Sequence, residues 1–87
     1  MKQAIWNYGQ KKSKVMKKYL VIFEKTKTGY SCYVPDLPGC IATGKTKIIA
    51  EKNIYEAIKF HIEGLEEEGL KVPVAKSESE MMVFIQE

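Results

Sequence analysis

The side chains that could do chemistry in this 87-residue chain are few and scattered. It has one histidine, His61, one aspartate, Asp36, two cysteines and no arginine. Cysteine nucleophiles need a nearby imidazole held by a third group, and metal sites need three or four clustered ligands. His61 falls among apolar neighbours on a predicted helix, and Asp36 lies between prolines, where a carboxylate commonly caps a turn. We therefore predict no catalytic, cofactor-binding or metal-binding residue, and expect a protein that is not an enzyme.

One phosphate-binding motif is complete in the sequence. Residues 39–46, GCIATGKT, satisfy the G-x-x-x-x-G-K-[ST] pattern. A working loop of this kind follows a buried parallel strand in an α/β sheet, with a second acidic residue for magnesium. Here Pro35 and Pro38 break the chain just ahead of the motif, and residues 40–42 read as a strand. We interpret the match as chance spacing and keep nucleotide binding as a minor alternative.

The first half of the predicted fold is a set of short strands. Residues 19–25 are rich in aromatic and β-branched side chains and predict a strand, which a turn joins to a second strand at 30–34. Residues 35–39, PDLPG, cannot continue a central ladder because proline has no N–H to donate. They predict a shaped loop, followed by a short third strand at 40–42.

One helix and a last strand complete the predicted fold. Thr46 is a suitable N-cap, and apolar residues then recur at spacings of three and four until about residue 68, before Gly69. Residues 81–85, MMVFI, predict a final strand. The expected fold class is α+β, a three-stranded antiparallel sheet with one main helix and then a final strand (β-β-β-α-β).

Both faces of the predicted sheet are apolar. In the first strand Tyr19, Val21 and Phe23 face one side, while Leu20 and Ile22 face the other. A single helix covers only one face of a sheet, so the other face needs further chain, a second copy or another protein. The pattern therefore predicts partner binding or a homo-oligomer.

The net charge of +3 is unevenly distributed. Residues 1–18 contain six lysines and no acid, whereas residues 19–87 contain eight lysines and eleven acids. We divide the chain into a basic arm, 1–18, and one domain, 19–87, whose acidic balance suits a basic protein partner. Residues 1–15 are also read as an upstream extension, with Met16 as a natural start. Nucleic-acid binding by the arm, with Trp6 and Tyr8 stacking on bases, is an alternative.

Two features bear on the compartment. No run approaches the roughly 18 apolar residues that cross a bilayer, so no membrane association is expected. Cys32 and Cys40 lack the multiple-bridge pattern of small secreted folds, and we expect reduced thiols and a cytoplasmic protein.

Two groups of residues are candidates for partner binding. The helix ends in an acidic run with Glu63, Glu66 and Glu67, which is either a solvated face or a docking patch for a basic partner. The loop residues Pro35, Asp36 and Leu37 form the second group. They either shape the fold or contact a partner.

Residues 19–73 resemble the HicB family of antitoxins. The resemblance is carried by the tyrosine-led first strand, Gly29-Tyr30 in the hairpin, the segment VPDLPGC at 34–40, Gly44 four residues before Ile48, a helix with Glu51, Asn53 and Ala57, and the ending from Gly69 to Pro73. Gly39 and Gly44 of the phosphate-loop match are the family's own turn glycines.

The resemblance implies a fold, a partner and a function. The fold would be a partly degenerate ribonuclease H-like one without catalytic acids. The function would be to bind a small HicA-type toxin, an mRNA-cleaving protein, and to mask its active surface. Many family members continue into a DNA-binding segment, but this sequence stops after the predicted final strand. We therefore do not expect DNA binding by such a segment. An orphan oligomeric domain is the remaining alternative.

Overall fold

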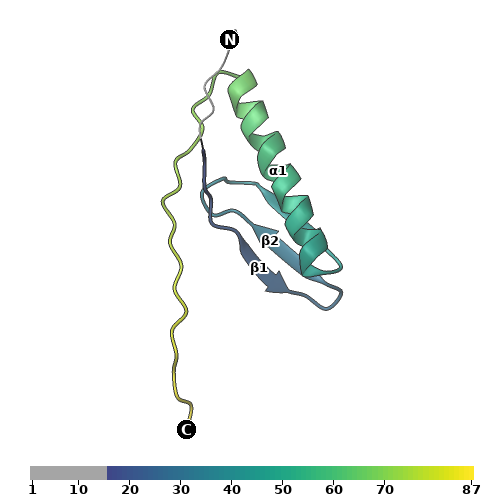
Figure 1. Ribbon diagram of the computed structural model, residues 1–87, viewed down its shortest axis with the longest axis vertical. Helices are drawn as coiled ribbons and strands as arrows, with labels where there is room; N and C mark the ends of the chain where they lie inside the picture. The colour runs from purple at the N-terminus through teal and green to yellow at the C-terminus, as the bar shows by residue number, and fades with distance from the viewer. Residues whose placement is uncertain (1–15) are drawn as a thin grey trace, which may run out of the picture.

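The structure is an antiparallel sheet with one long helix lying against it (Figure 1). The computed structural model describes residues 16–87. Strands β1 (Ile22–Lys25), β2 (Tyr30–Tyr33) and β3 (Ile41–Gly44) pair in the order β1-β2-β3, and helix α1 (Lys47–Glu67) follows. The predicted α+β class, with three antiparallel strands followed by one helix, is confirmed.

The strand register decides which side chains meet the helix. Cys32 of β2 pairs with Phe23 of β1 and Ala42 of β3, and side chains in register point to the same face. These three lie on the side of α1 and belong to the core or pack against it. The neighbouring register partners Tyr33 and Ile41 point the other way, and Ile41 is 68% exposed. Within residues 16–87, the helix therefore covers one sheet face and leaves the other open.

The start of α1 follows the capping signal in the sequence. The Thr46 hydroxyl accepts a hydrogen bond from the Ile49 backbone N–H (3.1 Å), which satisfies one of the free donors at the helix start. Lys47, the first helical residue, places its Nζ 5.3 Å from the centroid of the Phe23 ring, a cation–π contact between helix and sheet. The predicted start and end of the helix are both confirmed.

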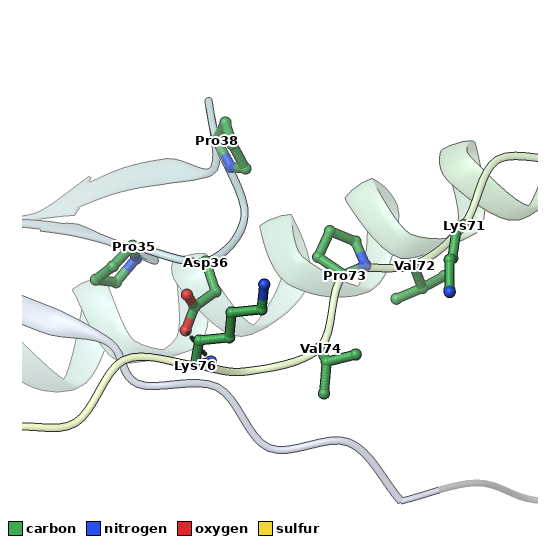
Figure 2. Close-up of a pocket in the computed structure, with 8 residues that line it drawn as sticks. All are labelled: Pro35, Asp36, Pro38, Lys71, Val72, Pro73, Val74 and Lys76. Atoms are coloured by element: carbon green, nitrogen blue, oxygen red, sulfur yellow. Dashed lines mark hydrogen bonds between the residues drawn. The ribbon is translucent and has the colours of Figure 1, made fainter.

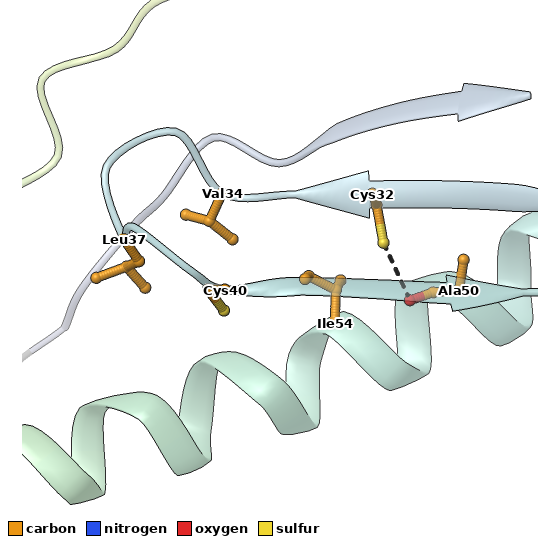
Figure 3. Packing of buried hydrophobic residues seen from close by; sticks show 6 residues of the cluster. All are labelled: Cys32, Val34, Leu37, Cys40, Ala50 and Ile54. Carbon is orange, nitrogen blue, oxygen red and sulfur yellow. Dashed lines mark hydrogen bonds between the residues drawn. The ribbon is translucent and has the colours of Figure 1, made fainter.

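The core is small and brings β2, the following loop and α1 together (Figure 3). Cys32 is fully buried, and its thiol lies 3.5 Å from the Ala42 carbonyl oxygen and 3.6 Å from that of Ala50. Cys32 and Cys40 are both free thiols, and burial raises the pKa of each. Both act as small apolar side chains, as predicted for Cys32. The buried cluster comprises Cys32, Val34, Leu37, Cys40, Ala50 and Ile54.

The C-terminal segment differs from the prediction. Residues 70–87 have no regular secondary structure, and the final strand predicted at 81–85 is not formed within the described chain. Figure 1 shows this segment turning from green to yellow along its length, with its last part running clear of the sheet and helix. A strand exists only when its backbone pairs with another strand, and none lies beside these residues here. The ribonuclease H-like relationship stays a prediction.

The basic arm lies mostly outside the described part of the chain. Residues 1–15, which include Trp6 and Tyr8, are outside the described residues. The structure therefore tests neither the predicted stacking on bases nor the hypothesis of an upstream extension. Of the arm, only the exposed residues 16–18 are described.

Candidate partner-binding site

The loop at 35–40 is closed by its own backbone. The Val34 N–H donates to the Cys40 carbonyl (3.1 Å), and the Cys40 N–H donates to the Leu37 carbonyl (3.0 Å). Pro35 and Pro38 have no N–H to satisfy, so they fit a tight loop that cannot lie inside a ladder. Leu37 is fully buried and anchors the loop from inside. Of the three loop residues predicted to bind a partner, Leu37 therefore faces the core.

Asp36 connects this loop to the C-terminal segment. Its carboxylate accepts hydrogen bonds from the backbone N–H groups of Ser77 (2.9 Å) and Lys76 (3.0 Å) and from the Ser77 hydroxyl (3.2 Å). These bonds favour the charged carboxylate, and the backbone bond from Ser77 contributes most to lowering the pKa of Asp36. Figure 2 shows the carboxylate directed at the passing chain. Asp36 is a tether, an internal role that the sequence did not reveal.

A shallow groove lies where the loop meets the C-terminal segment. Its volume is about 480 Å³. Nearby, the Tyr19 hydroxyl donates to the Pro73 carbonyl (2.6 Å) and holds the same segment. Burial, with a smaller contribution from the Asp36 charge, raises the pKa of Tyr19. The groove is lined by Pro35, Asp36, Pro38, Lys71, Val72, Pro73, Val74 and Lys76 (Figure 2).

The phosphate-loop match occupies a strand, not a loop. Residues 41–44 of the match are β3 and pair with β2, so their backbone serves the ladder and does not form a cradle for a phosphate. Gly44 packs against the helix, because a Cβ built there would lie 2.8 Å from the Ala50 Cα. A glycine is required at position 44 because any side chain there would collide with the backbone of α1.

The acidic residues of α1 lie on its outer surface. Glu63, Glu66 and Glu67 are all exposed. Glu56, Phe60, Glu63 and Glu67 follow one another at spacings of four, three and four, which places them on one stripe of the helix. Phe60 is 78% exposed in the middle of that stripe. We call these four residues the outer stripe.

The predicted partner-binding residues fall into three environments. Pro35 and Asp36 line the groove, Leu37 is in the core, and the three glutamates lie on or beside the outer stripe. Sequence reasoning missed Phe60. The signal was available, since position 60 lies off the apolar spacing that marks the buried helix face.

The single histidine of the chain lies on α1. His61 is half-buried on α1. No group of three or more histidine, cysteine, aspartate or glutamate side chains within residues 16–87 is arranged to hold a metal ion. Over the same residues, no helix has the length and apolar character required to span a bilayer.

Comparison with known proteins identifies the family. Residues 19–85 match the family described as the HicB-like antitoxin of bacterial toxin–antitoxin systems. The matched residues include the three-stranded sheet and the helix that follows it. The chain belongs to the HicB-like antitoxin family, as its sequence indicated.

Two curated relatives and one solved structure are similar over most of the domain. A UPF0150 protein of Thermoplasma acidophilum is 49% identical over 57 residues, covering 64% of this chain and 83% of that protein. An uncharacterised 14.9 kDa protein from the rep-hol intergenic region of Haemophilus phage HP1 is 46% identical over 55 residues, covering 63% of this chain. This alignment spans only 41% of the phage protein.

The solved structure is a complex of HicA3 and HicB3, a toxin and antitoxin. It matches this chain with a TM-score of 0.56 and 40% sequence identity. The match covers 63% of this chain and 64% of the solved chain. This likeness, together with the family match, supports an antitoxin role within a toxin–antitoxin system.

Proposed function

We propose that this protein binds and masks a small basic toxin of the HicA type, without catalysing a reaction itself. Family membership supports the antitoxin role, and the similar solved structure is a complex of such a pair. The observation that carries the proposal is the outer stripe of α1, where an exposed aromatic ring lies between two glutamates along the helix. A toxin that cleaves mRNA acts in the cytoplasm, so the proposal places this protein there.

Charge supports a basic partner at this end of the helix. Residues 63–68 contain four glutamates and no basic residue, and the last turn of α1 has no base. Acids at a helix C-terminus oppose the helix dipole and cost a few tenths of a kcal/mol each. A negative patch would steer a lysine- or arginine-rich partner toward this surface and favour its orientation there.

Phe60 supplies the anchor that a charged patch alone lacks. Aromatic side chains that become buried at the centre of an interface often carry much of its binding free energy, with polar groups around them. An exposed Phe60 between Glu56 and Glu63 has this arrangement. We assign the loop a supporting part, in which Leu37 holds its shape and Asp36 fixes the adjoining chain, with Pro35 at the groove.

The test is binding of a HicA-type toxin encoded beside this protein, measured by isothermal titration calorimetry with the full chain. Phe60→Ala should weaken binding by about 30-fold, as expected for an interface hot spot. Glu63→Lys combined with Glu67→Lys should slow association and reduce its salt dependence, because the steering charge is reversed.

Glu51→Lys is the matched control. Glu51 is exposed on α1 and lies nine positions before Phe60, about 180° around the helix. It should leave the affinity nearly unchanged. A toxin that binds all variants equally would show that the outer stripe is only a solvated face, and a toxin that does not bind the unaltered chain would refute the proposed function.

A further inference from the structure

The C-terminal segment carries a run of exposed apolar side chains. Residues 81–85 are all apolar, and each is between 68% and 95% exposed. Singly exposed apolar side chains are ordinary on a surface, but a continuous extended run is a site for pairing with another strand. The same residues carried the sequence signal for a strand. The pattern is therefore that of a strand without its neighbour.

The path of the chain directs this run away from its own sheet. Asp36 holds residues 76 and 77, and the Tyr19 hydroxyl holds Pro73. Beyond these anchors the segment runs past the sheet and ends far from the body of the molecule (Figure 1). The described chain has principal extents of 65 × 27 × 26 Å, and the segment accounts for the long axis.

The edge at β1 has the right length to receive such a strand. In the order β1-β2-β3, β1 pairs only with β2 among the described strands, and its other side has backbone groups free to form a ladder. A five-residue strand is about 17 Å long, a common strand length. β1 itself has four residues, Ile22–Lys25, so it can pair with most of the five-residue run.

Charge complementarity favours β1 as the acceptor. Residues 78–87 contain three glutamates and no base, with Glu78 and Glu80 before the apolar run and Glu87 after it. Residues 17–27 contain four lysines and one glutamate: Lys17 and Lys18 precede β1, Lys25 is its last residue and Lys27 follows it. Opposite charges on paired strands stabilise the pair, whereas two such tails paired with each other would bring acids together.

We propose that residues 81–85 of one copy add a strand to the β1 edge of a second copy, which returns its own strand in the same way. The exchange gives a two-fold dimer in which the same two surfaces are used twice, so the pairing of run and β1 edge closes at two copies. It goes beyond toxin binding, because it uses β1 and the C-terminal segment and not the outer stripe of α1.

Light scattering of the full chain after size-exclusion chromatography tests the assembly. The unaltered protein should have the mass of two chains. Val83→Pro should give the mass of one chain, because proline removes a ladder donor from the middle of the strand. Position 83 is 92% exposed, so this variant should still fold. Ser79→Pro, placed before the strand, is the matched control and should stay dimeric.

Crosslinking distinguishes exchange from pairing within one chain. Two copies of different tagged length, one with Glu24→Cys on β1 and one with Val83→Cys, are mixed and treated with a bismaleimide. The native cysteines are buried and should react slowly. Exchange predicts a crosslinked species containing both copies. It also predicts that residues 81–85 lose hydrogen-exchange protection on dilution, in step with dimer dissociation.

Three results would overturn the proposal. One is a monomer in which residues 81–85 are protected, which would mean pairing within the chain. Another is a dimer that Val83→Pro leaves intact, which would place the interface elsewhere. The third is a doubly substituted Glu24→Cys, Val83→Cys chain that crosslinks only within itself. Toxin binding by the Val83→Pro monomer is measured separately, so failure here leaves the proposed function untouched.

Discussion

Two segments without helix or strand behave in opposite ways in this molecule. The 35–40 loop closes on itself through backbone hydrogen bonds and buries Leu37 completely. The C-terminal segment, residues 70–87, is held at a few anchors and then exposes five consecutive apolar side chains. The comparison shows that irregular backbone is well fixed where its polar groups are satisfied locally. An apolar pattern alone does not say which chain will cover it.

The largest expected difference between the two segments is in the free energy of unfolding lost when a leucine in each is truncated to alanine. Leu37→Ala leaves a cavity in the core and should lower the free energy of unfolding by about 2–5 kcal/mol. The same change at Leu70, which is 54% exposed, should cost less than about 1 kcal/mol. Urea unfolding followed by circular dichroism measures both.

A conservative variant keeps this prediction measurable if the alanine variant does not fold. Leu37→Met preserves most of the side-chain volume and should cost less than about 1.5 kcal/mol. Equal losses at positions 37 and 70 would break the contrast between the two segments.

A smaller effect is expected at Gly39, which gives the loop its shape. Gly39 has φ +84°, a left-handed conformation that side chains other than glycine adopt at a cost. Gly39→Ala should lower the free energy of unfolding by about 1–2 kcal/mol, although a Cβ there meets no neighbour within 4 Å. Gly64→Ala within α1 is the control, and should raise stability by about 0.5–1 kcal/mol through helix propensity. A neutral Gly39→Ala would mean that the loop is not fixed by its backbone.

The smallest effect concerns the tether between the two segments. The folded pKa of Asp36 is lowered, so its contribution to holding the C-terminal segment is fully present above the unfolded pKa of about 3.9. That contribution is lost as the pH falls through the lowered folded pKa. The amide proton resonances of Lys76 and Ser77 should shift together across that range in an NMR titration.

Asp36→Asn should remove this titration while leaving the sheet and helix intact. Glu78→Gln is the control: it removes an exposed carboxylate close by, and the titration of the Lys76 and Ser77 amide resonances should remain. Amide resonances that titrate unchanged in Asp36→Asn would show that another group holds the segment.

Most of the domain could be predicted because its signals are local. The prolines at 35 and 38 end one strand and force a loop, and Thr46 and Gly69 mark the ends of the helix region. Each acts on its own few residues, whatever the rest of the chain does. The final strand was predicted from equally clear residues, but a strand also needs a partner, and composition does not say where that partner lies.

The candidate site was predictable only in part for a similar reason. The glutamates of α1 were visible as a charge run, and their exposure follows from a helix covering one sheet face. Phe60 lies off the apolar spacing of the buried helix face, but that spacing marks it only as exposed and does not indicate a binding surface. The part played by Asp36 depends on residues about 40 positions further along the chain, a separation that no local pattern encodes.

The position of the Asp36 tether has a consequence for how copies would assemble. Only residues 78–80 separate the anchored Ser77 from Met81, so the exposed run can search only a small volume around its anchor. Once one copy has docked its run, the reciprocal run of the other copy faces its acceptor at an effective concentration in the millimolar range. Two pairings that are each weak would then act together. Half-exchanged pairs should be scarce at any dilution, because avidity makes the second docking follow the first.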